Sequence, residues 1–140
     1  MDIKDLIPQR EPFLFIDKVI ESSPEQIMTQ FEFSASLDFF KGHFPGNPIV
    51  PGVILCEHCF QSGAALISSN SKGDFKQALA VVSRIQSAKF KNIVKAGESV
   101  TTKTELIERI DNAAFFKSIS TNSENKKVLI LEFACTLVES

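Results

Sequence analysis

The chain has 140 residues, of which 44% are apolar and 23% charged, and a formal net charge of −2. A chain of this length buries about 70% of the surface that its unfolded form exposes, which is enough for one core without disulfides or metals. The slightly negative charge excludes a general nucleic-acid binder, because phosphate recognition needs a clear basic excess.

Neither a signal peptide nor a membrane span is expected. Residues 1–10 are polar and mixed in charge, and no apolar run reaches the roughly 18 residues that span a bilayer. The three cysteines, an odd number, fit a reducing compartment. No repeat, low-complexity tract or linker interrupts the sequence, so we expect one cytoplasmic domain over residues 1–140.

The first predicted elements are two strands that form a hairpin. Phe13–Ile20 and Gln26–Ser34 are rich in phenylalanine and isoleucine and alternate these with polar residues. The turn-like residues 22–24 divide them.

A turned loop and a buried helix follow. Three prolines and three glycines between Gly42 and Gly52 forbid regular structure there, so His43 lies on a tightly turned loop. From Gly52 onward an apolar run predicts a helix over Val53–Ile67, with a polar loop after it at residues 68–73. Glu57 is a lone acid inside this run, and such a carboxyl is costly to bury unless it is paired, protonated or used.

The rest of the chain reads as long antiparallel strands separated by turn residues. These strands are predicted at Ala78–Phe90, Glu98–Ile110, Ala113–Thr121 and Lys127–Val138. The helix has little polar face for solvent, so the sheet must curl around it. We therefore predict an α+β fold with one long buried helix wrapped by an antiparallel sheet of about six strands.

The closely spaced Cys56, His58 and Cys59 could suggest a metal or redox site. A structural zinc ion needs four ligands, usually from two separated pairs, and the remaining cysteine is the distant Cys135. Inside an apolar helix a free cysteine behaves as a small hydrophobic residue. We expect these cysteines to pack in the core, with no metal bound.

Residues 39–66, FFKGHFPGNPIVPGVILCEHCFQSGAAL, resemble the signature of the FabZ-type (3R)-hydroxyacyl-acyl carrier protein dehydratases. That pattern runs G-H-F-P-G-x-P-x-x-P-G-V and then places an acid and a glutamine, positions that His43, Glu57 and Gln61 fill here. IPQREPFLFIDKV and AKFKNIVKAGESV resemble the opening and a later block of the same family. The resemblance covers nearly the whole chain and implies the hotdog fold.

The chain departs from the family pattern at several positions. Gln9 replaces the opening histidine, Ala96 replaces a later proline, and His58, Cys59 and Phe60 follow the acid where small or thioether side chains are usual. None of these changes removes a catalytic group, but they alter the shape of the acyl pocket.

The resemblance implies dehydration of a 3-hydroxyacyl thioester on acyl carrier protein in fatty acid or related lipid biosynthesis. A neutral histidine, His43, suits the base that removes the C2 proton, and Glu57, with its pKa raised by desolvation, suits the acid that protonates the departing hydroxyl. The backbone N–H of Gly52, at the helix start, is expected to face the enolate oxygen, and Gln61 to orient the carboxyl. No metal or organic cofactor is required.

Further roles follow from the same resemblance. Phe44, Pro45 and Gly46 support the histidine loop, while Phe60 and Val53 line the substrate tunnel. Two subunits are expected to pair their sheets edge to edge, so that His43 of one chain faces Glu57 of the other. The minimum unit implied is a homodimer, often assembled into a hexamer as a trimer of dimers.

Acyl carrier proteins are acidic, so a docking surface needs local positive charge. Arg84, Lys89, Lys91 and Lys95 lie within twelve residues of one another, and Lys89 and Lys91 share a face if both lie on a strand. The alternative interpretation is an ordinary solvated edge whose lysines discourage aggregation.

Two other functions remain open from the sequence. A hotdog acyl thioesterase would bind the same thioesters but hydrolyse them, and its usual sites lack the H-F-P-G loop. A non-catalytic acyl-binding hotdog subunit is the second alternative, because His58 and Phe60 are atypical for the dehydratases.

Overall fold

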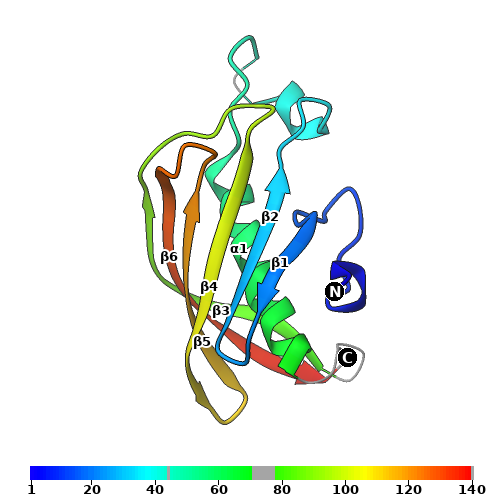
Figure 1. Cartoon of the computed structure of the whole chain (residues 1–140), viewed down its shortest axis with the longest axis vertical. Coiled ribbons are helices and arrows are strands. Elements are labelled where there is room, and N and C mark those ends of the chain that lie inside the picture. Colours follow the sequence, from blue (N-terminus) through cyan, green and yellow to red (C-terminus); the bar gives the residue numbers. More distant parts are fainter. Residues whose placement is uncertain (44, 71–77, 140) are drawn as a thin grey trace.

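The computed structural model describes residues 1–43, 45–70 and 78–139 (Figure 1). The elements, in chain order, are η1 (Ile3–Asp5), β1 (Lys18–Ser22), β2 (Gln26–Glu32), η2 (Asp38–Lys41), α1 (Gly52–Asn70), β3 (Ala78–Phe90), β4 (Ser99–Ile110), β5 (Ala113–Thr121) and β6 (Lys127–Glu139). No helix in these described ranges is long and apolar enough to cross a membrane.

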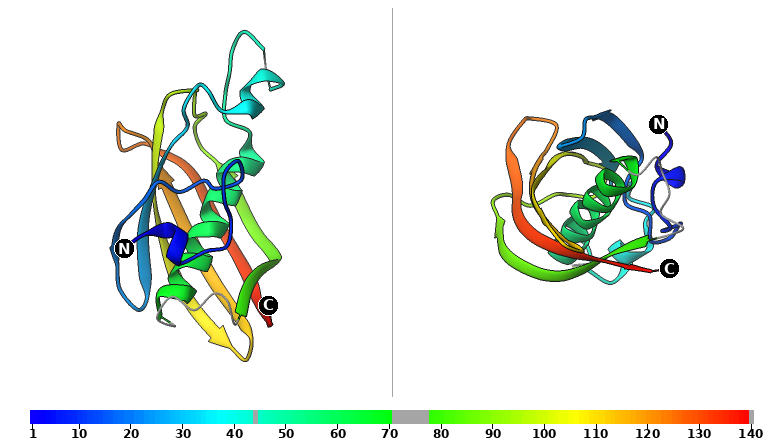
Figure 2. Two further views of the ribbon diagram at one scale, coloured as in Figure 1. Left: turned by 90° about the vertical axis from the view of Figure 1, so that its right-hand side faces the viewer. Right: turned by 90° about the horizontal axis from the view of Figure 1, so that it is seen from below.

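The six strands form one antiparallel sheet in the order β1-β2-β4-β5-β6-β3. The sheet curls around α1, which lies in its concave side (Figure 2). This is the predicted arrangement of one buried helix in an antiparallel sheet. The short β1 and the long β3 are the two edges, and β3 pairs on one side only, with β6.

Close packing joins α1 to the centre of the sheet. Gly63 is buried, and a Cβ at this position would lie only 3.1 Å from Cζ of Phe133 on β6. Phe133 in turn stacks on Phe116 of β5, with ring centroids 5.1 Å apart. The glycine thus lets the helix approach the sheet at a distance that any side chain would increase.

The inner face of the sheet is partly polar, which is unusual for a core. β5 buries Phe116, Ser118 and Ser120 and turns Phe115, Lys117 and Ile119 outward. These serines bond to buried threonines of β4, Ser120 to Thr102 at 2.6 Å and Ser118 to Thr104 at 2.7 Å. The buried Thr29 of β2 bonds to Ser62 of α1 at 2.7 Å.

The structure corrects two of the predicted boundaries. The strand predicted over Phe13–Ile20 is wrong in its first half, because β1 begins at Lys18 and runs to Ser22. Residues 13–15 instead cross the open side of α1, where helix side chains bind their backbone. The predicted polar loop is wrong at residues 68–70, which complete the last turn of α1; residues 71–73 lie outside the described part of the chain.

Candidate active site

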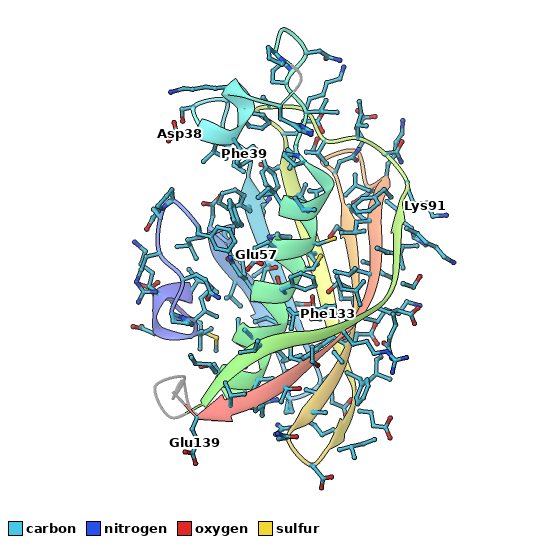
Figure 3. All side chains as sticks on the ribbon, turned by 180° about the vertical axis from the view of Figure 1, so that it is seen from behind. Asp38, Phe39, Glu57, Lys91, Phe133 and Glu139 are labelled. Atoms are coloured by element: carbon cyan, nitrogen blue, oxygen red, sulfur yellow. The ribbon has the colours of Figure 1, made fainter. Side chains whose placement is uncertain are left out.

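Glu57 lies in the middle of α1 and is half-buried at the wall of a cavity (Figure 3). The cavity has a volume of about 370 Å³ and is formed by the N-terminal segment, the helix and the β3 edge. Its lining residues are Gln9, Phe13, Glu57, Phe60, Gln61, Ala64, Ala80, Val81 and Val82. Among the described residues of this lining Glu57 is the one acid, next to two amides and six apolar side chains.

Burial raises the pKa of the Glu57 carboxyl above its ordinary value, and the hydrogen bond from Gln61 lowers it by less. The neighbouring thiols of Cys56 and Cys135 also have raised pKa values because they are buried, that of Cys135 to about 12. They are uncharged near neutral pH. The raised pKa that the sequence predicts for Glu57 is present, so the carboxyl retains its proton to higher pH than an exposed glutamate.

Gln61 fixes the orientation of Glu57 and is itself fixed by the backbone. Its Oε1 accepts from the N–H of Phe15 at 2.8 Å, and its Nε2 donates to the carbonyl of Phe13 at 2.9 Å. The same Nε2 donates to Oε2 of Glu57 at 3.0 Å. Because a backbone N–H can only donate and a carbonyl can only accept, these contacts set which end of the amide is oxygen. The hydrogen bond expected between Gln61 and Glu57 is thus present.

Gln9 also lines this cavity. Its Oε1 is buried, so it does not face the cavity as placed, and it has no hydrogen-bond partner among the described residues. A buried acceptor without a partner is costly, and a small rotation of the side chain toward a ligand donor would relieve that cost. The sequence marked this position only as a departure from the family pattern; that its amide oxygen is buried and unsatisfied depends on the tertiary structure.

His43 lies on the loop between η2 and α1, and its Nδ1 is 2.9 Å from the carbonyl oxygen of Ile49. A carbonyl only accepts, so Nδ1 carries the proton, and in the neutral ring the lone pair is on Nε2. The loop is braced by the segment after β3: the N–H of Val50 donates to the carbonyl of Val94 at 2.7 Å, and that of Ala96 to the carbonyl of Pro48 at 3.2 Å.

His43 is not among the described residues that line the Glu57 cavity. The loop residues 45–49 project beyond the N-terminal end of α1, whereas Glu57 lies further along the helix (Figures 1 and 3). In the described part of the chain the histidine loop and the Glu57 cavity are thus separate features.

Gly52 is the first residue of α1, as predicted for a helix start. No acceptor among the described residues bonds its N–H. A Cβ here would lie 3.0 Å from Cε1 of Phe90, so only glycine fits against that ring without a shift. At the helix start, therefore, the N–H of Gly52 has no acceptor within the helix, and the Phe90 ring leaves no room for a side chain at this position.

The remaining predicted pocket and loop residues are placed as follows. Phe60 lines the Glu57 cavity and packs edge-on against Phe133 at 5.1 Å. Val53, in contrast, is 75% exposed on the first helical turn and outside that cavity. Pro45 and Gly46 are exposed, and Gly46 has a φ of 89°, which favours glycine. Phe44 lies outside the described residues.

The four basic residues proposed for docking are all exposed. Arg84 and Lys89 lie on β3, and Lys91 is the first residue after it, with its N–H still bonded to the carbonyl of Val128. Lys91 points outward near the end of β3 (Figure 3). Lys95 pairs with Ile49 in an isolated bridge, which places it next to the histidine loop.

The cysteines pack in the core as the sequence predicts. All three are free and buried, and Cys59 Sγ lies 3.4 Å from Ser120 Oγ. Within residues 1–43, 45–70 and 78–139 there is no group of cysteine, histidine, aspartate and glutamate side chains placed to hold a metal ion. His58 is fully buried and bonded to protein atoms at both ring nitrogens.

Comparison with known proteins gives consistent matches over most of the chain. A family model described as ApeI dehydratase, of the ApeI-like family, matches residues 19–129. The 3-hydroxyacyl-acyl-carrier-protein dehydratase FabZ of Lactobacillus helveticus is 38% identical over 112 residues, which are 79% of this chain and 74% of the relative. FabZ of Ligilactobacillus salivarius is 37% identical over 121 residues, 86% of this chain and 85% of the relative.

Among solved structures, a chain of the dehydratase heterocomplex ApeI:P from Xenorhabdus doucetiae matches with a TM-score of 0.85. The match covers 100% of this chain and 93% of that chain, at 13% sequence identity. At this identity the likeness concerns the fold alone, and it agrees with the hotdog architecture predicted from the sequence.

Proposed function

Because the chain belongs to the ApeI-like dehydratase family and has FabZ dehydratases among its relatives, we propose that it converts (3R)-3-hydroxyacyl thioesters on acyl carrier protein to trans-2-enoyl thioesters. The reaction serves fatty acid or related lipid biosynthesis. Residues 1–140 act as one hydro-lyase domain without a metal or organic cofactor. The observation that carries the proposal is Glu57, a half-buried carboxyl with a raised pKa at the wall of a cavity beside an exposed sheet edge.

In the proposed reaction His43 is the base. Its Nε2 takes the C2 proton, and the C–H electron pair moves onto the thioester carbonyl as an enolate. The hydrogen bond from Nδ1 to Ile49 supports this role, because it holds the neutral ring with the lone pair on Nε2.

Glu57 is the acid in the proposal. Its carboxyl gives a proton to the C3 hydroxyl, the C–O bond breaks, water leaves, and the C2–C3 double bond forms as the enolate collapses. The raised pKa supports this role, because the carboxyl must hold its proton before the reaction. Gln61 supports it by holding the carboxyl in one orientation.

Two further groups hold the substrate in this proposal. The N–H of Gly52 donates to the developing enolate oxygen; in other enzymes the loss of one such donor costs roughly 3 to 4 kcal/mol. When substrate binds, the Gln9 side chain turns its buried, unsatisfied Oε1 toward the cavity and accepts a hydrogen bond from the C3 hydroxyl, which leaves an oxygen lone pair of that hydroxyl facing Glu57. Phe60 is the wall that limits the acyl chain.

The proposed active unit is a homodimer paired through β3. This strand is a sheet edge and exposes Val81, Ile85 and Phe90 by 49%, 53% and 53%. Pairing two such edges satisfies their unpaired backbone groups and covers the apolar side chains. Residues 80–82 of the same strand line the Glu57 cavity, so a partner's chain would cover that cavity and bring its His43 loop close.

The decisive experiment is incubation of the protein with crotonyl and longer 2-enoyl thioesters of pantetheine and acyl carrier protein. Loss of the enoyl absorbance with formation of the 3-hydroxyacyl thioester, abolished in His43→Ala, is the expected result. Release of free thiol would identify a thioesterase instead. An unchanged substrate that still binds would identify a non-catalytic acyl-binding subunit.

A further inference from the structure

His58 follows the proposed acid directly in the chain, yet its side chain lies wholly in the core, whereas that of Glu57 is half-buried at the cavity wall. It is fully buried between α1, the N-terminal segment and β4. Its Nδ1 is 2.6 Å from the carbonyl oxygen of Phe15, and its Nε2 is 2.8 Å from Oγ1 of Thr102. Both ring nitrogens are therefore satisfied.

The Phe15 carbonyl sets the direction of every hydrogen in this chain of contacts. A carbonyl only accepts, so Nδ1 donates to it, and the neutral ring must accept at Nε2 from the Thr102 hydroxyl. Ser120, 2.6 Å away, then donates to Thr102. The Cys59 thiol, at 3.4 Å, completes the chain as the donor to Ser120. Burial lowers the pKa of His58 to about 4, which keeps the ring neutral as this pattern requires.

The backbone that His58 and Gln61 hold leads directly to the wall of the Glu57 cavity, because Gln61 and Phe13 line that cavity and Phe15 lies in the same segment as Phe13. The N–H of Phe15 donates to Gln61 and its carbonyl accepts from His58, so helix side chains bind both backbone groups of this residue. Phe13, two residues earlier, lines the cavity, and its carbonyl shares the Gln61 amide with Glu57. No strand ladder holds residues 13–15, because β1 begins only at Lys18.

From this geometry we infer that His58 is a positioning residue for Glu57: it fixes Phe15, and Phe15 in turn fixes Gln61, which holds both the Glu57 carboxyl and the backbone of Phe13. The inference rests on the proposed function for its effect on turnover. Without His58, the Phe15 carbonyl would lose its partner, the Phe15 N–H would no longer hold Gln61 in place, and more water would reach the half-buried Glu57 carboxyl.

The test compares His58→Leu, which fills the space without hydrogen bonds, with His58→Gln, which keeps one donor and one acceptor. The Glu57 carboxyl is titrated by carbon-13 NMR in glutamate-labelled protein, with Glu57→Gln to assign its signal. We expect the pKa of Glu57 to fall toward its ordinary value in His58→Leu and to return most of the way in His58→Gln. Replacing His58 removes no charge, because His58 is neutral and the nearby Cys56 and Cys135 are uncharged. Such a change in the pKa of Glu57 therefore reports how far the surrounding residues shield its carboxyl from water.

Turnover is measured on the same variants as a function of pH. In His58→Leu we expect kcat to fall about 10- to 100-fold, with little change in KM, and the loss of activity at rising pH to begin at lower pH. His58→Gln should recover most of kcat. Thr104→Val is the matched control, because it removes another buried hydroxyl pair, with Ser118, that does not contact residues 13–15.

An unchanged Glu57 titration in folded His58→Leu overturns the inference, as does an equal change in Thr104→Val. If His58→Leu does not fold, Thr102→Val is tested instead, because it leaves His58 bonded only to Phe15. A smaller fall in the pKa of Glu57 is then expected. An unchanged pKa of Glu57 in this variant overturns the inference. The titration needs no turnover. An inactive wild-type protein would therefore refute the proposed function while the role of His58 is still decided.

Discussion

At Glu57 two neighbours act in opposite directions on one carboxyl. Burial by the cavity wall raises its pKa, and the Gln61 amide, which stabilises the charged form, lowers it by less. The amide fixes the orientation of the carboxyl, and burial at the cavity wall raises the pH up to which the carboxyl keeps its proton. Both depend on residues 13–15, which are not adjacent to Glu57 in sequence.

We predict that His43→Ala and Glu57→Gln each reduce dehydration by about 10²- to 10⁴-fold while the fold and oligomer persist. The double variant should lose far less than the product of the two effects, because both groups act in one transition state. Steady-state rates, with circular dichroism as the folding control, test this. Activity close to wild type in either single variant would contradict the assignment.

Gln9 permits a test of substrate contact without turnover. In a His43→Ala background, Gln9→Ala should weaken binding of a 3-hydroxyacyl thioester by about 2- to 10-fold, the value of one hydrogen bond. Binding of the matching enoyl thioester should not change, since it lacks the hydroxyl. Calorimetry of both ligands measures this, and equal weakening of the two would assign Gln9 to the cavity wall alone.

At the scale of elements, β3 combines three properties. It is an edge of the sheet, its residues 80–82 line the Glu57 cavity, and it carries the exposed Arg84 and Lys89 further along the strand. The segment after it braces the His43 loop through Val94 and Ala96. One stretch of chain therefore connects the sheet edge, the cavity and the basic surface.

Lys89→Glu combined with Lys91→Glu should reduce turnover of substrates bound to acyl carrier protein, because that protein is acidic and the variant repels it. Turnover of pantetheine substrates, which lack the acidic protein, should barely change. The loss should shrink at high salt, since both side chains are exposed. The control is Lys18→Glu with Lys103→Glu, which changes net charge equally at exposed positions of β1 and β4. Equal losses on both substrate types would place Lys89 and Lys91 in the structure or tunnel instead.

At the scale of the whole molecule, the described chain holds the two proposed catalytic residues apart. If His43 of one subunit works together with Glu57 of the other, each dimer has two active sites, and each site takes one residue from each subunit. Mixing His43→Ala and Glu57→Gln chains then creates dimers in which one site keeps both an intact histidine and an intact glutamate.

We predict that random reassociation of these two inactive variants restores about a quarter of wild-type activity, because half of the dimers are mixed and half of their sites are intact. Activity after joint refolding at equal concentrations measures this. Refolding each variant alone is the control. No recovery from dimers shown to be mixed would place His43 and Glu57 of one chain in the same site.

The core histidine makes whole-molecule stability depend on pH. The pKa of His58 is about 4 in the folded protein and near 6.5 when exposed, so between these values the unfolded chain binds more protons. The free energy of unfolding should therefore fall as pH drops from 6.5 toward 4, by about 3 kcal/mol for this group. Urea unfolding across this range, with His58→Gln as the control, should show a shallower slope in the variant.

The sequence by itself determined the parts that depend on local pattern. Proline and glycine forced the His43 loop, apolar continuity predicted the helix that carries Glu57, and β3 and β5 have the predicted bounds, Ala78–Phe90 and Ala113–Thr121. An isolated carboxyl in an apolar helix also predicted the raised pKa of Glu57. Roles in catalysis stay predictions that the experiments above decide.

Only the tertiary structure decided which polar groups, distant in sequence, become hydrogen-bond partners. Residues 13–17 have the alternation of a strand, yet Gln61 and His58 take the backbone groups of Phe15 that a sheet ladder would use. The serines and threonines of the inner face look solvent-facing in sequence, but they pair across strands and with His58. Such pairings depend on which strands become neighbours, and local periodicity carries no information about that because the partners are separated by tens of residues.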